Sequence, residues 1–456
     1  MKLYEGRVPG KPDPLMDRIN RSLPFDIRLL PFDLATNRAW AMELQHLGIY
    51  SQGELERVLA RLEEIQVMAR DGAFAELPPD EDIHTLVERL LTETLGSLGA
   101  RIHTGRSRND QVVCDLRLYT VDHGRRIVTA LLSLINTLAD RAEEHASTLL
   151  AGTTHLQPAL PVTLGHFLCS LAAGIARDVE RLREAIERTN RCPLGSGAMA
   201  GSGFPVDRDR LTRQLRFSAT LPNSIDAVSD RDFCQEMVSA CALTVTRLSR
   251  YAEQWIIWAN PCFGYVRFSD QWSTGSSMMP QKRNPDAMEL IRGKAARVSG
   301  ALTTLLSLTK GVPLTYAKDL QEDKEPLFDA LDTTELVVTV FTRATASAHF
   351  YPEAMSRALS GDMLATDLAD ALARAGIPFR KAHEQVASLV SRLEAQNRSL
   401  LDLSSVEMTE AFPVLSANPP QLDFQGSVAA RSVSGGTAPE QVKQQIAALR
   451  SFAAKT

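Results

Sequence analysis

The chain has 456 residues, a formal net charge of -5 and 44% hydrophobic residues. This length can bury a large core and form more than one structural region. The weak negative charge gives no electrostatic case for nucleic-acid binding, and no uncharged apolar run reaches membrane-spanning length. We therefore expect a small-molecule partner, with no nucleic acid and no membrane.

Six scattered cysteines, without a Cys-x-x-Cys pair, indicate reduced thiols rather than a disulfide framework or a zinc site. The opening residues 1–7 contain no apolar stretch typical of a secretory signal. Both features favour a cytoplasmic protein without a bound metal.

The predicted helices fall into an N-terminal helical domain at residues 1–106, a central long-helix bundle at 107–352 and a C-terminal helical domain at 353–456. The first region mixes short helical patterns with proline and glycine breaks, and Ser51 with Glu54 predicts a capping box. In the third region the apolar spacing loosens and the predicted helices shorten.

The central region carries apolar stripes whose spacing alternates between three and four residues. Such stripes predict long helices that pack at shallow angles. Strand-like alternation is nearly absent, so we predict an all-α fold of three helical regions around a long central helical bundle. The stripes comprise Leu116, Tyr119, Ile127, Leu131, Leu134 and Leu138, then Leu168, Ala172, Ile175, Val179, Leu182 and Ile186, then Met237, Cys241, Leu248, Tyr251, Trp255 and Trp258, and then Leu327, Leu331, Val338 and Phe341.

The most informative stretch is Gly-Ser-Ser-Met-Met-Pro-Gln-Lys-Arg-Asn-Pro-Asp at residues 275–286. Its glycine and serines favour a mobile loop, and Asn284 as N-cap with Pro285 as first helical residue predicts a helix start. A helix N-terminus binds anions, and Lys282 lies just ahead of it while Ser276 lies on the loop. This combination suits removal of a proton beside a carboxylate, because donors await the negative charge that develops.

This stretch resembles the signature Gly-Ser-Ser-x-Met-Pro-x-Lys-x-Asn-Pro of the fumarase/aspartase superfamily. The run that follows, residues 286–292, makes the chain similar to the argininosuccinate lyase family within it. An ordinary loop before a buried helix would explain the cap and the apolar spacing, but not Ser276, Lys282 and Asn284 together. The resemblance covers nearly the whole chain, and its departures lie at residues 4–8 and 35–40.

A histidine lies in the run Thr-Thr-His-Leu-Gln-Pro at residues 153–158, just before a proline, which predicts a turn. A lone histidine is usually structural. The resemblance implies more, since the superfamily keeps its catalytic histidine in such a Thr-His-x-Gln run. It implies His155 as a catalytic residue oriented by Glu289, with Thr154 as a substrate contact.

Residues 104–110, Thr-Gly-Arg-Ser-Arg-Asn-Asp, form a second loop that enters a helix. Capping by Asn109 or Asp110 would explain the run by itself. Two arginine forks beside helix N–H groups also predict a carboxylate site. The run matches the family motif, which implies substrate contacts from Ser107, Arg108 and Asn109.

The densely charged residues 316–325 are typical of a solvated surface. They also match the family segment that binds the amino-acid end of the substrate. The resemblance therefore implies Tyr316, Gln321 and Lys324 as substrate contacts.

Two N-terminal runs also match the family. Residues 20–26 imply Ser22 and Asp26 as substrate contacts. Asp82 and His84 lie in a further family-like run, Glu-Asp-Ile-His-Thr.

Residues 195–200, Gly-Ser-Gly-Ala-Met-Ala, fit the dinucleotide pattern G-x-G-x-x-A. That pattern requires a preceding strand within a βαβ unit, and a long predicted helix precedes it here. Neither a Walker lysine nor metal-ligand spacing is present, so we expect no cofactor.

The resemblance implies reversible β-elimination of argininosuccinate to L-arginine and fumarate, a step of arginine biosynthesis. Ser276 is the preferred base, and His155, oriented by Glu289, is on the acid side. Lys282 and Asn284 stabilise the carbanion. The opposite assignment of base and acid stays open. The family also forms homotetramers with active sites shared between chains.

Two alternatives stand beside this hypothesis. One is a related lyase acting on another N-substituted aspartate, which the runs at 104–110 and 316–325 disfavour. The other is a non-catalytic structural homologue, as the lens crystallins of this family are. Retention of His155, Ser276 and Lys282 disfavours the second.

Overall fold

The structure is a computed structural model that describes residues 13–455. The expected absence of a secretory signal at residues 1–7 and the family departure at residues 4–8 concern residues outside this part. The described chain folds into two compact units whose segments alternate along the sequence. Unit 1 comprises the chain up to Val128 with Arg181–Ala242 and Arg297–Thr334, and unit 2 comprises Thr129–Glu180, Leu243–Ala296 and the chain from residue 335. The division at residues 106 and 352 stays a prediction.

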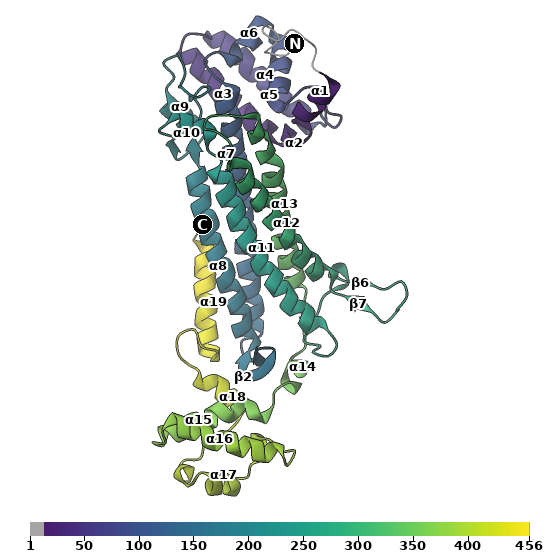
Figure 1. The fold of residues 1–456 in the computed structure, drawn as a ribbon, viewed down its shortest axis with the longest axis vertical. Coiled ribbons are helices and arrows are strands. Elements are labelled where there is room, and N and C mark those ends of the chain that lie inside the picture. Colours follow the sequence, from purple (N-terminus) through teal and green to yellow (C-terminus); the bar gives the residue numbers. More distant parts are fainter. Residues whose placement is uncertain (1–12, 456) are drawn as a thin grey trace. The chain divides into compact units, whose positions relative to one another are not determined.

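Long helices carry the chain from one unit into the other (Figure 1). They are α7 (Arg108–Glu144), α8 (Leu164–Thr189), α11 (Asp232–Ala259), α12 (Asp286–Thr309) and α13 (Lys324–Ala346). The predicted apolar stripes are buried along them apart from the partly exposed Tyr251, and on α7 Leu131, Leu134 and Leu138 have no exposed surface. Apolar residues with this spacing share one buried face only when the segment is helical, so the spacing indicates helices. The predicted all-α class is confirmed.

Shorter helices complete unit 1. They are α1 (Pro14–Asn20), α2 (Leu23–Asp26), α3 (Leu30–His46), α4 (Gln52–Arg70), α5 (Ile83–Leu95), α6 (Ser97–Ala100), α9 (Arg208–Gln214) and α10 (Ser224–Ser229). The predicted capping box starts α4: Ser51 Oγ accepts from Glu54 N at 3.3 Å, and the Glu54 carboxylate accepts from Ser51 N at 2.8 Å. Strands β3 (Arg191–Cys192) and β4 (Ala219–Thr220) pair in parallel.

Unit 2 has an aromatic core around Trp255, whose ring centroid lies 5.7, 5.8 and 5.5 Å from those of Phe268, Phe341 and Phe350. Its further helices are α14 (Pro352–Arg357), α15 (Ala365–Arg374), α16 (Phe379–Glu394), α17 (Ser405–Ala411), α18 (Phe424–Ala430) and α19 (Pro439–Ala454). Its strands are β1 (Leu149–Thr154), β2 (Gln157–Thr163), β5 (Val266–Arg267), β6 (Thr274–Gly275), β7 (Arg283–Asn284) and β8 (His349–Phe350). Among the described residues, no helix is both long and apolar enough to span a membrane.

Candidate active site

One cavity of about 360 Å³ in unit 1 gathers most of the predicted substrate contacts. Its walls come from α2, from the starts of α5 and α7, and from the 3₁₀ helix Lys318–Asp323 with the residues beside it. The predicted residues in these walls are Ser22, Asp26, Ser107, Arg108, Asn109, Tyr316, Gln321 and Lys324, together with Asp82 and His84. Segments far apart in the sequence thus converge on one concave surface, as ligand sites do. We call it the unit 1 cavity.

The start of α7 is fixed by the buried carboxylate of Asp110. One oxygen accepts a hydrogen bond from Ser107 N at 3.1 Å, and the other accepts from Gly195 N at 3.0 Å and Gly197 N at 2.8 Å. Both glycines have left-handed backbones, with φ of 88° and 59°. Ser107 precedes the helix, and its Oγ accepts from Asn109 N at 3.2 Å, so Ser107 is the cap rather than Asn109 or Asp110. The glycine-rich run at residues 195–200 therefore provides backbone N–H donors to the Asp110 carboxylate.

The two arginines of the run at 104–110 are already paired with protein groups. Arg108 donates to the Asp82 carboxylate at 3.1 Å and to Thr85 Oγ1 at 3.1 Å. Arg106 is buried and donates to Asn37 Oδ1 at 2.8 Å. Only Arg108 lines the cavity, and it does so as half of an ion pair, so the convergence of both guanidinium groups on an anion stays a prediction.

Two aspartates contribute to the acidic side of the unit 1 cavity. Asp26 accepts from Ser22 Oγ at 2.6 Å and from the first backbone N–H of α5 at 3.1 Å. Burial raises the pKa of Asp26 to about 6. Burial also acts on Asp82, but the charge of Arg108 and the hydrogen bonds from Thr85 hold the pKa of Asp82 below its ordinary value.

A buried cation faces these carboxyl groups. Lys324 is 4% exposed, and its Nζ donates to Asp323 Oδ1 at 2.9 Å. The same carboxylate forms a buried ion pair with Arg231. Gln321, beside it, donates from Nε2 to the backbone oxygen of Asn20 at 3.2 Å. These contacts hold the cavity wall in place without a ligand.

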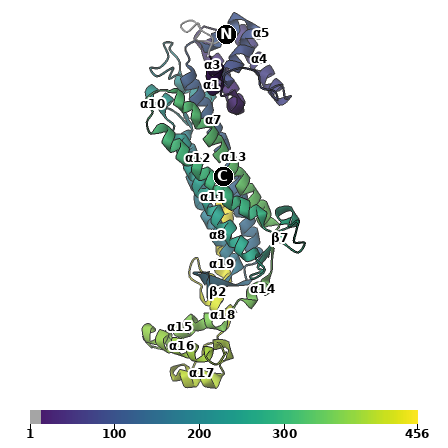
Figure 2. The ribbon, with the colours of Figure 1, turned by 45° about the vertical axis from the view of Figure 1, so that its right-hand side comes forward.

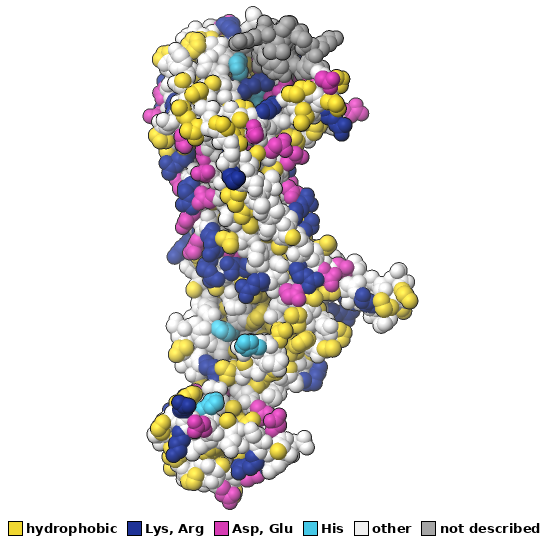
Figure 3. All heavy atoms as spheres, viewed as in Figure 1, with side chains coloured by type: hydrophobic (Ala, Val, Ile, Leu, Met, Phe, Trp, Pro, Cys, Tyr) yellow, Lys and Arg dark blue, Asp and Glu magenta, His cyan; other side chains and the backbone are white. Residues whose placement is uncertain are grey.

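The signature stretch lies in unit 2 as a loop between β6 and β7. The loop projects from the neighbouring helices in both ribbon views (Figures 1 and 2). Ser276 Oγ accepts hydrogen bonds from Met278 N at 3.3 Å and Met279 N at 3.0 Å. Figure 3 shows hydrophobic side chains on the projecting loop, where Met278 is 87% exposed. Lys282 is exposed as well.

Asn284 is not the N-cap that the sequence predicts, because α12 begins at Asp286. Asn284 lies in β7 and pairs with Thr274 of β6. The Asp286 carboxylate accepts from the backbone N of Thr274 at 2.9 Å and from its Oγ1 at 2.5 Å. A short ladder therefore ties the base of the loop to the start of α12, which leaves residues 276–282 as the part between the strands.

His155 lies in a turn, as predicted, at the tip of the β1–β2 hairpin. The hairpin turn consists of His155 and Leu156, and Thr154 pairs with Gln157 across it. The φ angles of 55° and 61° at the two turn residues are those of a type I′ turn, which usually needs glycine or asparagine. Such strain persists mainly where it serves a function. The turn leaves the side chains of Thr154 and His155 exposed.

Lys282, Asn284 and Glu289 line a second cavity, of about 650 Å³, in unit 2. Ser276 and His155 are not among the residues that line it. In the described part of unit 2, no hydrogen bond joins His155 to Glu289. A single chain therefore does not make the predicted orienting contact.

Some residues at the unit 1 cavity were not singled out from the sequence. Glu81 and His103 also line it, and burial lowers the pKa of His103 to about 4, so this imidazole is neutral at pH 7. Asp110 was recognised only as a possible cap. The signal available in the sequence was that Asp110 directly follows the predicted substrate contacts Ser107, Arg108 and Asn109.

Comparisons with known proteins agree with this picture. The family model described as "Lyase" matches residues 6–300, and the model described as "Argininosuccinate lyase C-terminal" matches residues 362–429. Argininosuccinate lyase of Chloroflexus aurantiacus is 46% identical over 451 residues, which is 98% of each chain. That of a Roseiflexus species is 47% identical over 98% of this chain and 99% of the relative.

A solved structure extends the likeness to the fold. An EDDS lyase variant with bound fumarate superposes with a TM-score of 0.83 at 27% identity, over 98% of this chain and 91% of that one. The similarity therefore runs through both units. From these matches along its length, the chain belongs to the argininosuccinate lyase family.

Proposed function

We propose that this protein catalyses the reversible β-elimination of argininosuccinate to L-arginine and fumarate. The observation that carries the proposal is the unit 1 cavity, where ten residues from separate family motifs converge around opposite charges. Relatives at 46% and 47% identity are named argininosuccinate lyases, and a structural neighbour holds fumarate. We also place the reaction in the cytoplasm, in arginine biosynthesis.

The amino-acid end of argininosuccinate binds in the unit 1 cavity. Its ammonium group is held by Asp26, whose carboxylate lies beside Ser22. Its carboxylate is held by Lys324, because two of the three Nζ donors remain after the bond to Asp323. Tyr316 and Gln321 complete the contacts from the same wall.

Ser276 acts as the base on the carbon beside one succinyl carboxylate. Two backbone N–H groups already point at its Oγ, and hydrogen bonds to an anionic oxygen favour the anion. Lys282, Asn284 and the N-terminus of α12 stabilise the negative charge that develops on the substrate.

His155 protonates the guanidino nitrogen that departs. The exposed hairpin turn presents it to solvent within one chain, which suits a residue that completes the site of another chain. Glu289 of that other chain orients the imidazole. The reverse assignment, with His155 as base and Ser276 as proton donor, stands as the alternative.

The active protein is a homotetramer whose sites draw His155, Asn109 and Ser276 from different chains. Exposed leucines on three of the long helices support this assembly. They are Leu243, Leu290, Leu306 and Leu336, with exposed fractions of 49, 62, 52 and 51%. Leucines that are half exposed in one chain would be covered if these helices packed against those of other chains.

Ultraviolet detection of fumarate tests the proposal. Argininosuccinate should release fumarate, while adenylosuccinate and aspartate, added at the same concentration, should not. Release from another N-substituted aspartate alone would identify a related lyase. Release from none would identify a non-catalytic homologue.

A further inference from the structure

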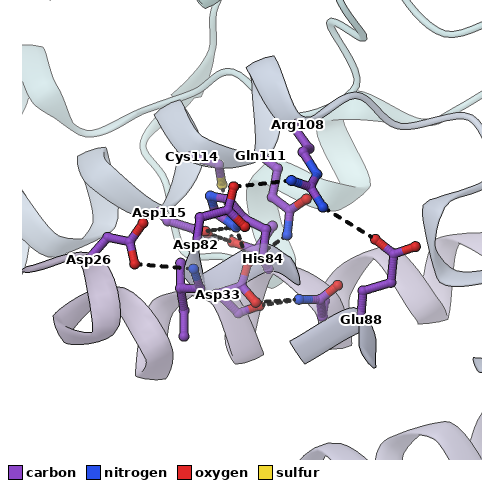
Figure 4. A network of polar contacts seen from close by, with 12 residues as sticks. Asp26, Asp33, Asp82, His84, Glu88, Arg108, Gln111, Cys114 and Asp115 are labelled. Carbon is purple, nitrogen blue, oxygen red and sulfur yellow. Dashed lines mark hydrogen bonds and ion pairs between the residues drawn. The ribbon is translucent and has the colours of Figure 1, made fainter. Parts of the chain in front are cut away.

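Two buried carboxyl groups lie against the inner edge of His84, which lines the unit 1 cavity. Nδ1 of His84 is 2.8 Å from Asp33 Oδ1 and 3.6 Å from Asp115 Oδ2. Both aspartates have no exposed surface, whereas the ring of His84 reaches the cavity wall. Figure 4 shows the ring directed at the two carboxyl groups, which come from α3 and α7.

The first carboxyl group is built to be an anion. Asp33 accepts from Asn37 Nδ2 at 2.8 Å and from Gln111 Nε2 at 2.5 Å, besides His84. Burial opposes ionisation, but the hydrogen bond from His84 and the charge of Arg106 keep the pKa of Asp33 below its ordinary value. Two adjacent carboxyl groups do not both ionise easily. Burial, with the charge of Asp33, raises the pKa of Asp115 well above its ordinary value, so Asp33 carries the shared negative charge.

An ionised Asp33 fixes the hydrogen of the imidazole. Because a carboxylate only accepts, Nδ1 of His84 carries a hydrogen, and the tautomer that this hydrogen bond selects presents Nε2 as an acceptor. Nε2 has no hydrogen-bond partner among the described residues. Asp33, His84 and Asp115 also come close enough to hold a cation. Asp33 and His84 are instead hydrogen-bonded to each other, and the Asp33 oxygens also accept hydrogen bonds from the amides of Asn37 and Gln111. This arrangement does not favour a cation.

We infer that Nε2 of His84 accepts a hydrogen bond from the ammonium group at the amino-acid end of the substrate, and that Asp33 is the residue that positions it. This inference rests on the proposed function. An ammonium group has three N–H donors, and the acidic side of the cavity, with Asp26 and Asp82, is where such a group belongs. His84 supplies a further acceptor there.

The test compares two inhibitors in the assembled enzyme. L-Arginine and its analogue without the α-amino group, 5-guanidinopentanoate, compete with argininosuccinate, and the ratio of their inhibition constants reports binding of the ammonium group. In His84→Asn the amide keeps the donor to Asp33 but does not reach the cavity. The preference for arginine should fall by about tenfold, the value of one hydrogen bond to a charged group.

His84→Gln places an amide oxygen near the position of Nε2, and it should keep most of the preference. Asp33→Asn leaves the imidazole in place but replaces the acceptor-only carboxylate by an amide that can also donate, so the hydrogen is no longer fixed on Nδ1 and the preference should fall as well. His123→Asn is the matched control. His123 is a buried histidine of α7 that contacts the Tyr119 backbone oxygen and does not line the cavity, so its loss should leave the ratio unchanged.

A ratio in His84→Asn equal to that of the unaltered protein overturns the inference, as does an equal loss in His84→Gln and His84→Asn. If His84→Asn does not assemble, Asp33→Asn decides, and an unchanged ratio there rejects the positioning role. Thermal midpoints separate these effects from unfolding. Fumarate release by the unaltered protein is measured first, so failure of the proposed function is seen separately from failure of the His84 assignment.

Discussion

The unit 1 cavity and the β6–β7 loop of unit 2 differ in how their functional groups are held. In the cavity, Asp26, Lys324 and Arg108 each have a protein partner at 3.1 Å or less. In the loop, Lys282 is exposed, and within residues 13–455 the Ser276 hydroxyl bonds only to the backbone of its own turn. In the proposed mechanism, one reaction therefore uses a wall that is complete in one chain and a loop that is not.

This difference separates recognition from chemistry. Groups fixed before binding lose little conformational freedom when the ligand arrives, so a formed wall favours affinity. A projecting loop can close over a bound ligand and exclude water before the proton transfer. The following predictions test whether the two regions have these separate roles.

The largest expected effect is on the loop side. Ser276→Ala should lower kcat by about 10²–10⁴-fold, the usual contribution of a positioned proton-transfer group. The thermal midpoint should not change, because the Oγ bonds only within the loop. Ser277→Ala is the neighbouring control. Steady-state fumarate release measures both variants, and near-normal turnover of Ser276→Ala would remove it from the mechanism.

The second prediction concerns the stability of the cavity wall. In Asp110→Asn the amide cannot accept from all three backbone N–H groups that the carboxylate holds, and one orphaned buried donor costs about 1–3 kcal/mol. Urea unfolding should show this loss. Asp122→Asn, on the same helix with a side chain 54% exposed, should show none. Equal stability of the two variants would mean that Asp110 does not fix the wall.

Tyr316→Phe removes one hydroxyl from the cavity wall. We expect KM for argininosuccinate to rise by about tenfold with kcat nearly unchanged, as for one lost hydrogen bond to a charged ligand group. Tyr50→Phe is the control. The Tyr50 hydroxyl donates to the Leu98 backbone oxygen at a distance of 3.1 Å, and Tyr50 does not line the unit 1 cavity. An early unfolding of Tyr316→Phe with unchanged KM would make the residue structural.

The smallest effect is a pH dependence of binding. Burial raises the pKa of Asp26 to about 6, so the group is a carboxylate above that pH and neutral below it. Because the neutral form attracts an ammonium group less, KM should rise as the pH falls through about 6. Asp26→Asn should have a higher KM and lose this rise. Identical pH profiles of KM in both proteins would contradict the assignment.

The sequence predicted the helices well, and its success has a simple cause. A stripe such as Leu131, Leu134 and Leu138 encodes a period of the backbone, and burial enforces that period locally. The capping box of Ser51 and Glu54 is equally local. The family motifs then indicated which distant segments would meet at the unit 1 cavity.

Features that depend on distant partners were missed. The ladder that places Asn284 opposite Thr274 needs a strand only two residues long on each side, too short for any alternation to show. The β1–β2 hairpin has no glycine in its turn, so the usual signal was absent. Asp33 and Asp115 lie on two different helices without any motif that links them, and only the fold brings them to His84.

The central claim is that the loop and the hairpin of one chain complete the cavities of others. Co-expression of His155→Asn with Ser276→Ala, each inactive alone, tests it most directly. A working site then needs its histidine from a Ser276→Ala chain and its serine from a His155→Asn chain. With random mixing in a closed tetramer, about one half times one half, or a quarter, of the sites should regain activity. If both residues of a site came from one chain, every site would carry one lesion, and mixed tetramers no more active than either parent would contradict the account.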